Sequence, residues 1–529
     1  MEGEEPRDFE ASVKALFPDA LAGRRASDID IDTLVVHGGR SRVRDRIAKG
    51  CQSTWVSAVT KALAAADGTS APGMSGLRMS ILKMAVQEDG SGGVVRTISE
   101  WVDGICGGGA GGLARTLRFR LIPKANGGVR PIGVGEAVVG VAKRVVATAL
   151  TEQVGDWLKL HGQWGVAVAD GCRVLSAAMA KMWDAGWAVA GLDVKDAFNS
   201  VHRRDVVEAV VERDRQLAPF VAWTLAPTTL VGEGGSEVVE RGVVQGDPLS
   251  PVLFALVLAK ATRRVHDRCR EAGVRLGLLV PGKEAVIMDC AAEGGYDALL
   301  GWYADDGTVA WKDERSFRVV VEQVVLALAE VGLELSATKC QVVAGRGCGG
   351  EVVESVCADL GMRVAPMLSV LGVPLGDVAM ARLFVSGAVE ESEAELRKLW
   401  ELGNPLAEIA VLRTSGLGVC VRWLLEAAPV GVVTEELMAK IRAAEEALVR
   451  HALGPEGETA SEAVMRQAVH PTKQGGLGMV SIDRCGVARD GRWVPRGPTR
   501  RTTLQSSGWW RGMSLRGGGG WSSRRRRTR

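Results

Sequence analysis

Two adjacent carboxylates, Asp305 and Asp306, stand between two short apolar runs and are followed by Gly307. An Asp-Gly step supplies the positive φ of a tight turn, so residues 299–311 are predicted to form a β-hairpin with both acids at its tip. Neighbouring carboxylates repel each other, and a divalent cation such as Mg²⁺, which prefers hard oxygen ligands, removes that repulsion. Taken alone, the stretch is equally compatible with a solvated turn that binds nothing.

A third carboxylate, Asp193, stands at the end of the continuous apolar run 187–194, which is typical of a buried strand. Three carboxylates at strand ends of one sheet would clamp two Mg²⁺ ions roughly 4 Å apart. One ion would lower the pKa of an attacking 3′-hydroxyl, and the other would hold a triphosphate and stabilise its pyrophosphate leaving group. This set of acids therefore indicates phosphoryl transfer, a chemistry that depends mostly on positioning and charge stabilisation.

A second predicted hairpin carries cations. Basic and apolar residues alternate from Thr116 to Lys124, a turn follows at Gly127 and Gly128, and residues 129–132 lead back. The two strands would present the basic side chains of Arg118, Arg120, Lys124 and Arg130. These side chains would contact phosphates or, as the alternative, form an ordinary solvated basic face.

The remaining periodicity is mostly helical. Gly104–Gly112 is predicted to be a flexible connection, and Pro248 is expected to open a helix that runs to about residue 270. The last forty-odd residues are predicted to be disordered. The other expected elements are helices over residues 53–66, 77–86, 136–158, 171–185, 313–331 and most of 377–453, and a hairpin over 228–244.

Composition excludes several classes of protein. The 529 residues suffice for about two to four packed units, and 47% hydrophobic and 24% charged residues are ordinary for a globular chain. No apolar run approaches the ~20 residues that span a bilayer, and the acidic N-terminus lacks a secretory signal. Ten cysteines without a CxxC pair argue against a zinc ribbon or a disulfide framework, so an intracellular location is expected.

Charge is distributed unevenly. The formal net charge is +2, yet residues 484–529 hold thirteen arginines and a single acid, Asp490. The tail therefore carries +12 and the rest of the chain −10, so a nucleic-acid channel in the body must come from local basic patches. The Arg/Gly/Trp-rich tail would bind RNA by charge and stacking, or it is the translation of a degraded or shifted reading frame.

Six motifs in order resemble the reverse transcriptase of non-LTR (LINE-type) retrotransposons over about residues 70–377. They are Arg120-Leu121-Ile122-Pro123-Lys124 with Arg130-Pro131-Ile132; Leu192-Asp193-Val194-Lys195-Asp196-Ala197-Phe198; Arg241-Gly242-Val243-Val244-Gln245-Gly246-Asp247-Pro248-Leu249-Ser250-Pro251; Tyr303-Ala304-Asp305-Asp306; Gly332-Leu333 with Lys339-Cys340; and Leu371-Gly372-Val373. The loop from Gln245 to Pro251 sets the chain apart from retroviral enzymes and group II intron maturases. Ala71-Pro72-Gly73-Met74-Ser75-Gly76 is similar to an extra N-terminal motif of this branch.

The resemblance implies an α+β right-hand polymerase fold with fingers, an antiparallel-sheet palm and a helical thumb. Leu371-Gly372 is similar to the primer-grip turn, and the helices after Asp377 would grip the template–primer duplex. The implied division is an N-terminal extension 1–70, fingers with the start of the palm 71–190, palm 191–376, thumb 377–455 and a C-terminal extension 456–529.

The resemblance also implies residue roles. Asp193, Asp305 and Asp306 would be catalytic ligands of two Mg²⁺ ions, for which Mn²⁺ can substitute. Phe198 matches the side chain that packs against the incoming sugar and excludes a 2′-hydroxyl; its alternative is plain core packing. Asn199 stands where many relatives carry a second acid, which removes no metal ligand.

Five further residues are implied to contact the incoming nucleotide. Gln245 and Gly246 would lie under the nascent base pair, and Lys124 and Arg130 would contact the triphosphate. Lys339 matches the position proposed to protonate pyrophosphate; its alternative is a surface charge. Ser336 replaces an asparagine frequent in relatives, and this change too is expected to leave catalysis intact.

The implied function is RNA-directed DNA polymerisation on an RNA template, with a DNA primer or target and dNTPs as partners and no obligate protein partner. About 70 residues precede the first motif, too few for an apurinic-type endonuclease, and neither a zinc knuckle nor an RNase H acid set is recognisable. The alternative is a truncated or degenerate element remnant that only binds RNA. An active enzyme is expected to work in the nucleus, or in a cytoplasmic ribonucleoprotein.

Overall fold

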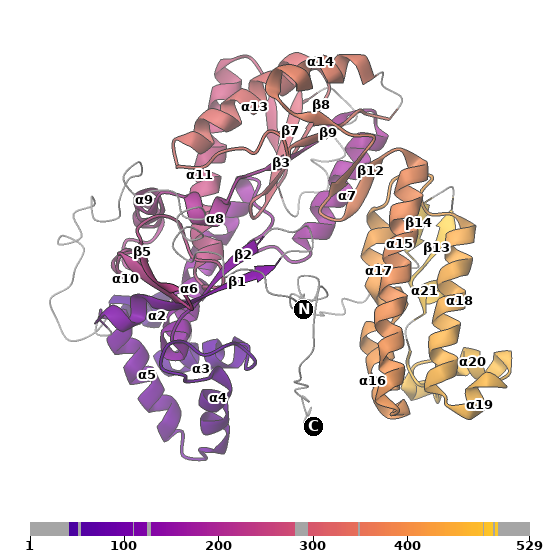
Figure 1. The fold of residues 1–529 in the computed structure, drawn as a ribbon, viewed down its shortest axis with the longest axis horizontal. Coiled ribbons are helices and arrows are strands. Elements are labelled where there is room, and N and C mark those ends of the chain that lie inside the picture. Colours follow the sequence, from indigo (N-terminus) through magenta and orange to yellow (C-terminus); the bar gives the residue numbers. More distant parts are fainter. Residues whose placement is uncertain are drawn as a thin grey trace.

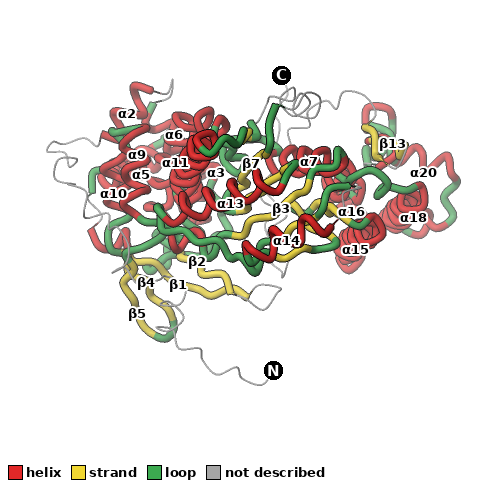
Figure 2. Tube along the Cα trace, turned by 90° about the horizontal axis from the view of Figure 1, so that it is seen from above, coloured by secondary structure: helices red, strands yellow, loops and turns green. Residues whose placement is uncertain are grey.

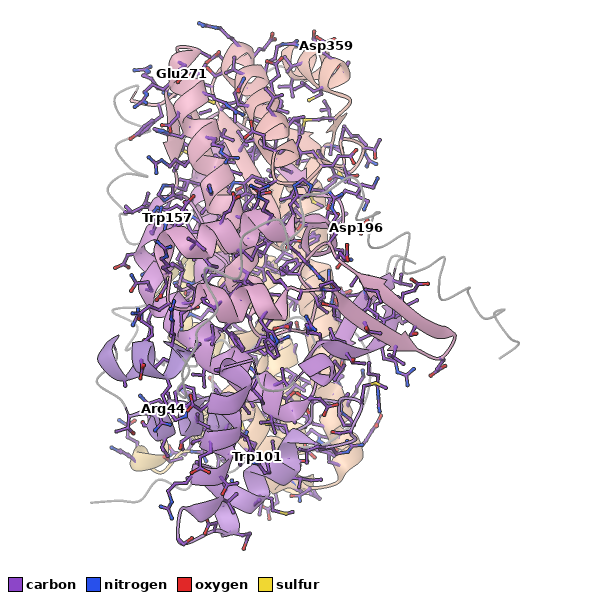
Figure 3. The ribbon with its side chains drawn as sticks, turned by 90° about the vertical axis from the view of Figure 1, so that its left-hand side faces the viewer. Arg44, Trp101, Trp157, Asp196, Glu271 and Asp359 are labelled. Atoms are coloured by element: carbon purple, nitrogen blue, oxygen red, sulfur yellow. The ribbon has the colours of Figure 1, made fainter. Side chains whose placement is uncertain are left out.

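A computed structural model describes most of the chain. The described residues are 42–50, 54–108, 111–123, 129–280, 295–346, 350–479, 481–489 and 492–495. Figure 1 shows the helices of residues 42–106 (α2–α5) at one end of the molecule, those of residues 378–452 (α15–α18) at the other, and a central sheet between and above them. Figure 3 shows the labelled Trp101, in α5 (Gly93–Cys106), and Asp359, in α14 (Gly350–Leu360), at opposite ends of the molecule.

The central sheet, here called the palm sheet, has six strands in the order β10-β9-β3-β8-β7-β6. Its inner pairs β9–β3, β3–β8 and β8–β7 are antiparallel, as predicted, whereas β10 and β6 add parallel edges. The strands are β3 (Ala188–Asp193), β6 (Leu276–Leu278), β7 (Ala298–Tyr303), β8 (Asp306–Trp311), β9 (Gln341–Val343) and β10 (Arg363–Val364).

Both faces of the palm sheet are covered, which explains the continuous apolar run of β3. Alternate residues of a strand face opposite ways: Ala190 packs with α11 (Ser250–Glu271), α13 (Glu314–Ala329) and α14 (Gly350–Leu360), whereas Val189 packs with α7 (Gly171–Asp184). In Figure 2, β3 accordingly lies between α7 and α14. The core on the α7 side continues into the C-terminal helices.

A second sheet, here called the fingers sheet, has the order β2-β1-β4-β5. The two predicted hairpins are both present, and they join because β1 pairs in parallel with β4. No local pattern predicted this union. The strands are β1 (Thr116–Pro123), β2 (Val129–Val134), β4 (Thr228–Gly232) and β5 (Gly235–Val239).

Helices surround the fingers sheet and link it to the palm. The predicted connection at Gly104–Gly112 begins too early, because α5 continues to Cys106 and Ile98 and Val102 bury its apolar face. The elements are α2 (Arg42–Gly50), α3 (Trp55–Ala65), α4 (Met79–Glu88), α5 (Gly93–Cys106), η3 (Gly111–Arg115), α6 (Ala137–Leu160), α8 (Ala197–Ser200), α9 (Arg203–Arg213) and α10 (Ala218–Thr224).

The C-terminal part begins with the hairpin β11 (Met367–Val370) and β12 (Val373–Gly376), whose turn holds Leu371 and Gly372, both with positive φ. Helices then follow as predicted, and Asp377 caps the first by accepting a hydrogen bond from Met380 N. They are α15 (Val378–Arg397), η4 (Lys398–Leu402), α16 (Pro405–Ser415), α17 (Leu417–Ala427) and α18 (Glu435–Ala452), with α19 (Pro455–Glu458), α20 (Glu462–Ala468), η5 (Thr472–Gln474) and α21 (Ile482–Cys485) after them.

The prediction of disorder is wrong for one part of the tail. There, β13 (Gly486–Arg489) and β14 (Arg492–Pro495) pair as an antiparallel hairpin, and β14 packs against α17. The arginine-rich residues beyond 495 lie outside the described part of the chain. None of the described helices is both long and apolar enough to cross a membrane.

Candidate active site

The register of the palm sheet brings two of the predicted acids together. Asp193 and Asp306 are directly paired residues at the end of the β3–β8 ladder, and Asp306 is also paired with Tyr303 of β7. Directly opposed residues lie about 4.5–5.5 Å apart and point to the same face. Two carboxylates far apart in sequence therefore share one end of one face.

The hairpin that carries Asp305 and Asp306 differs in detail from the prediction. Its turn is Ala304-Asp305, and Asp306 already belongs to β8. The positive φ, 55°, is at Ala304, and Gly307 lies within the strand. A Cβ on Gly307 would come within 2.5 Å of the Trp302 ring, so this glycine serves close packing instead of the turn.

Backbone hydrogen bonds fix Asp193, and Lys339 lies beside its carboxylate. Its N–H donates to Cys340 Sγ at 3.3 Å, and its C=O accepts from Ser336 N at 2.8 Å. The Oδ2 atom is inaccessible to solvent and has no hydrogen-bond partner. Lys339 Nζ lies 3.6 Å from it, and the Lys339 side chain is 71% exposed. The predicted lysine is therefore brought to the acids.

The donor set suits a hard cation. Carboxylate oxygens are the preferred ligands of Mg²⁺, and Asp193 Oδ2 accepts no hydrogen bond, so its lone pairs are available to a cation. As they stand, however, no three His, Cys, Asp or Glu side chains of the described residues are close enough to hold a metal ion alone. Substrate phosphates would have to complete the ligand set.

Phe198 and the predicted Gln-Gly loop are joined by the backbone. Phe198 follows β3 on the short helix α8, and its ring stacks on that of Phe254 with centroids 4.7 Å apart. Val243 N donates to Phe198 O at 2.6 Å, and Gly133 N of β2 donates to Gln245 O at 3.0 Å. The loop thus connects the end of β3 to the fingers sheet.

Glycine is required at position 246. Its φ is +95°, and a Cβ there would come within 3.1 Å of Ile132 Cγ2 and 3.2 Å of Gly133 O. The close backbone approach that a glycine permits is made here to β2. The predicted helix start at Pro248 is two residues early, because α11 begins at Ser250 with Pro251 in its first turn.

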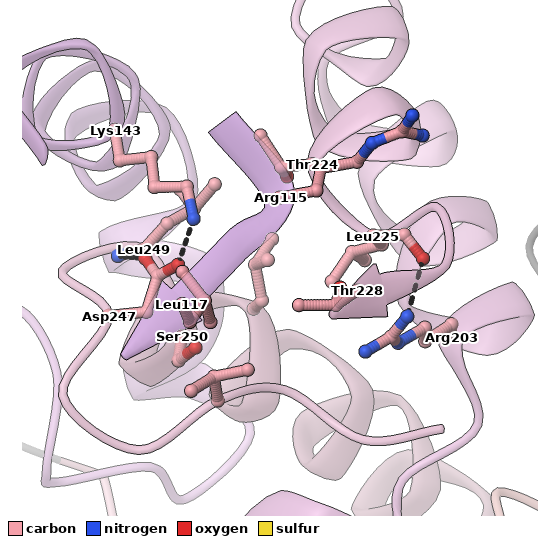
Figure 4. Close-up of a pocket in the computed structure, with 12 residues that line it drawn as sticks. Arg115, Leu117, Lys143, Arg203, Thr224, Leu225, Thr228, Asp247, Leu249 and Ser250 are labelled. Atoms are coloured by element: carbon pink, nitrogen blue, oxygen red, sulfur yellow. Dashed lines mark hydrogen bonds and ion pairs between the residues drawn. The ribbon is translucent and has the colours of Figure 1, made fainter. Parts of the chain in front are cut away.

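Two buried cations that support this loop were not predicted. Lys143 of α6 forms an ion pair with Asp247, and Arg203 of α9 donates to the carbonyls of Leu225, Val239 and Gly242. Figure 4 shows both beside a cavity of about 20 Å³. Burial lowers the pKa of Arg203 to about 10. This value is still well above neutral pH, so the guanidinium is charged there.

The predicted cations of the fingers hairpin are less constrained. Arg118 and Arg120 alternate along β1, and Arg130 is paired with Ile122, so all three share one face. Arg120 forms an ion pair with Glu233, and both side chains are at least half exposed. Lys124 lies outside the described residues.

Comparison with known proteins agrees with this architecture. A family described as reverse transcriptase (RNA-dependent DNA polymerase) matches residues 122–375. The Pol polyprotein of a type-1 R2 retrotransposable element from Nasonia vitripennis is 29% identical over 252 residues, covering 43% of this chain and 22% of that protein. A type-2 R2 counterpart from Drosophila melanogaster is 28% identical over 231 residues, covering 41% and 20%. The chain thus spans about a fifth of the length of the curated relatives it matches.

Among solved structures, apo telomerase from Candida tropicalis is similar with a TM-score of 0.37 and 10% identity, over 65% of this chain and 62% of that one. The palm sheet, fingers sheet and C-terminal helices form a right-hand polymerase fold of the α+β class. Residues 122–375 are a reverse transcriptase domain of the non-LTR (LINE-type) class.

Proposed function

We propose that this chain is an RNA-directed DNA polymerase that extends a primer 3′-hydroxyl with dNTPs on an RNA template. The observation that carries the proposal is the direct pairing of Asp193 with Asp306 at the end of the palm strands, inside the region that matches the reverse transcriptase family. Asp305 occupies the adjoining turn. This arrangement supports the proposal, because nucleotidyl transfer uses neighbouring carboxylates to hold two metal ions.

Asp193, Asp305 and Asp306 would hold two Mg²⁺ ions, which activate the primer hydroxyl and neutralise the phosphates when bound. Lys339 would hold a proton at Nζ beside the departing pyrophosphate, since it already lies 3.6 Å from Asp193 Oδ2. Arg130, on the exposed face of the fingers hairpin, would bind the triphosphate.

Gln245 and Gly246 would lie under the nascent base pair, and Phe198 would face the sugar. Because Phe198 is only half-buried and stacks on the buried Phe254 ring, its rim would block a 2′-hydroxyl while its face packs in the core. RNA template, DNA primer or target and dNTPs are thus the proposed partners. The proposed place of action is the nucleus, where the DNA target would be.

Primer extension tests the proposal. We expect labelled dNTPs to be incorporated on a primed RNA template with Mg²⁺, and Asp305→Ala to abolish incorporation. Asp156→Ala is the matched control, because Asp156 is a 95% exposed acid on α6 that forms a surface ion pair with Lys159. Incorporation by the Asp305→Ala protein would refute the site. Binding of RNA without incorporation by the parent would leave an RNA-binding remnant.

A further inference from the structure

A short segment between α6 and α7 runs alongside the end of β7. Trp164 N donates to Trp302 O at 2.7 Å, and Trp302 N donates to Gly162 O at 2.8 Å, so that Gln163 forms a parallel bridge with Trp302. No motif marks this segment in the sequence. It nevertheless adds a hydrogen-bonded partner to the palm sheet just before the Ala304-Asp305 turn.

The Gln163 side chain holds the backbone of Ala304. It is 1% exposed, and its Oε1 accepts hydrogen bonds from Ala304 N and from Gly165 N, each at 2.9 Å. Its Nε2 donates to Ala304 O at 3.4 Å. One amide therefore binds both polar backbone groups of a single residue, which requires a donor and an acceptor on the same side chain.

Ala304 needs such support because its backbone is left-handed. A φ of 55° costs a residue with a Cβ about 1–2 kcal/mol, and such a conformation persists only where the surroundings impose it. The strained residue comes directly before Asp305 and two before Asp306. A relaxation of Ala304 would therefore redirect both carboxylates.

We propose that Gln163 is a positioning residue that holds the Ala304-Asp305 turn in the conformation in which Asp305 and Asp306 face the substrate together with Asp193. The inference rests on the proposed polymerase function. Only an amide satisfies all three hydrogen bonds: glutamate would keep the acceptor and lose the donor, and methionine would keep the shape and lose both.

Gly165 offers a second way to disturb the same turn. A Cβ at this position would come within 2.5 Å of Ala304 N and 3.2 Å of Ala304 Cα. Gly165→Ala therefore pushes mainly on the turn; the new Cβ would also lie 3.2 Å from Gln163 Oε1, but the amide keeps its donor and its acceptor. Both variants are expected to cause the same defect if the turn geometry is what matters.

The test compares steady-state kinetics of the full chain with its ability to bind a metal. For Gln163→Met we expect kcat for dNTP incorporation to fall about a hundredfold, as for a misplacement of about 1 Å, with the Kd for the primed RNA changed less than twofold. Binding of Mn²⁺ in the presence of primed RNA and a non-reactive dNTP analogue, whose phosphates complete the ligand set, should weaken in parallel when followed by electron paramagnetic resonance. Gly165→Ala should reproduce both changes.

Two further proteins separate positioning from general destabilisation. Thr262→Val removes a buried hydrogen bond from Thr262 to Leu258 O within α11 and is expected to leave kcat and Mn²⁺ binding within twofold of the parent. Adding Ala304→Gly to Gln163→Met removes the cost of the positive φ, so we expect at least a threefold recovery of kcat.

The outcomes distinguish the two proposals. If the parent incorporates dNTPs, Asp305→Ala does not, and Gln163→Met retains the kcat and Mn²⁺ binding of the parent, Gln163 has no positioning role while the polymerase assignment stands. A loss in Gln163→Met that Thr262→Val matches, without recovery by Ala304→Gly, would likewise overturn the inference. A parent without incorporation would refute the proposed function instead.

Discussion

The end of the palm strands carries carboxylates and the β1–β2 hairpin of the fingers carries cations, and the two regions hold their charges in opposite ways. Asp193 and Asp306 are fixed by the register of a sheet that is covered on both faces. Arg120 and Arg130 lie on an exposed face, where Arg120 pairs with the surface residue Glu233. Carboxylates that repel each other must be held together by the fold, whereas cations on long flexible stems can adjust to a phosphate.

The largest effect is expected in the palm. Asp193→Asn keeps the backbone bonds to Cys340 and Ser336 but removes a charge, so the fold should persist and kcat should fall roughly a thousandfold. Primer extension and thermal unfolding measure the two quantities. A midpoint of unfolding that drops along with kcat would show that the carboxylate is structural.

The Gln-Gly loop that connects the palm to the fingers sheet can be destabilised at Lys143. Its ion pair with Asp247 is largely buried, with 8% and 13% of the side chains exposed. Lys143→Met leaves an uncompensated carboxylate and should lower the free energy of unfolding by about 3 kcal/mol. Denaturant titration tests this value. In the double variant with Asp247→Asn, at least half of the loss should be recovered; no recovery would contradict the buried-pair explanation.

Phe198 lies where the palm meets the Gln-Gly loop. Phe198→Ala should raise the efficiency of ribonucleotide incorporation relative to deoxynucleotide incorporation by about tenfold or more, because the side chain that would exclude the 2′-hydroxyl is gone. Competition between rNTP and dNTP measures the ratio. An unchanged ratio with a lower midpoint of unfolding would favour plain core packing against Phe254.

A smaller effect on dNTP incorporation is expected from a substitution in the fingers hairpin. Arg130→Ala should raise the KM for dNTP about tenfold, equivalent to 1.4 kcal/mol, and leave kcat within twofold, because an exposed cation contributes binding more than alignment. The effect should shrink as salt is added. A loss of kcat at unchanged KM would mean that the hairpin orients the reacting groups as the palm does.

The smallest effect is expected on the pH dependence of the free energy of unfolding, and it comes from Glu445 in α18. Unlike Asp193, Glu445 lies outside the proposed active site. Burial raises its pKa to about 7, and its oxygens accept from Ile482 N at 3.0 and 3.1 Å. The folded state therefore binds the proton more tightly than the unfolded state. The resulting stabilisation is fully present below the unfolded pKa of 4.5 and is lost as the pH rises through about 7.

Between about pH 6 and about pH 8, the free energy of unfolding should thus fall by on the order of 1 kcal/mol. Denaturant titrations at both values should show this fall in the parent and a smaller one in Glu445→Gln. An equal fall in both proteins would assign the pH dependence to other groups.

Local sequence patterns determined most of the secondary structure of this protein and identified its candidate catalytic acids. The apolar run of β3, the hairpins and the periodic helices follow from burial and turn chemistry that neighbouring residues encode. The acids Asp193, Asp305 and Asp306, and the order of motifs around them, were evident without a structure. The roles of the nucleotide-binding residues stay predictions, and Lys124 lies outside the described residues.

Only the tertiary structure decided how these pieces meet. It put the positive φ at Ala304 and packed Gly307 against the Trp302 ring, and it joined the two predicted hairpins into one sheet. Gln163 and Lys143 carry no local signal, since their partners are 141 and 104 residues away. A sequence pattern reports which face of its own element is buried, whereas a contact between distant elements depends on how every other element packs.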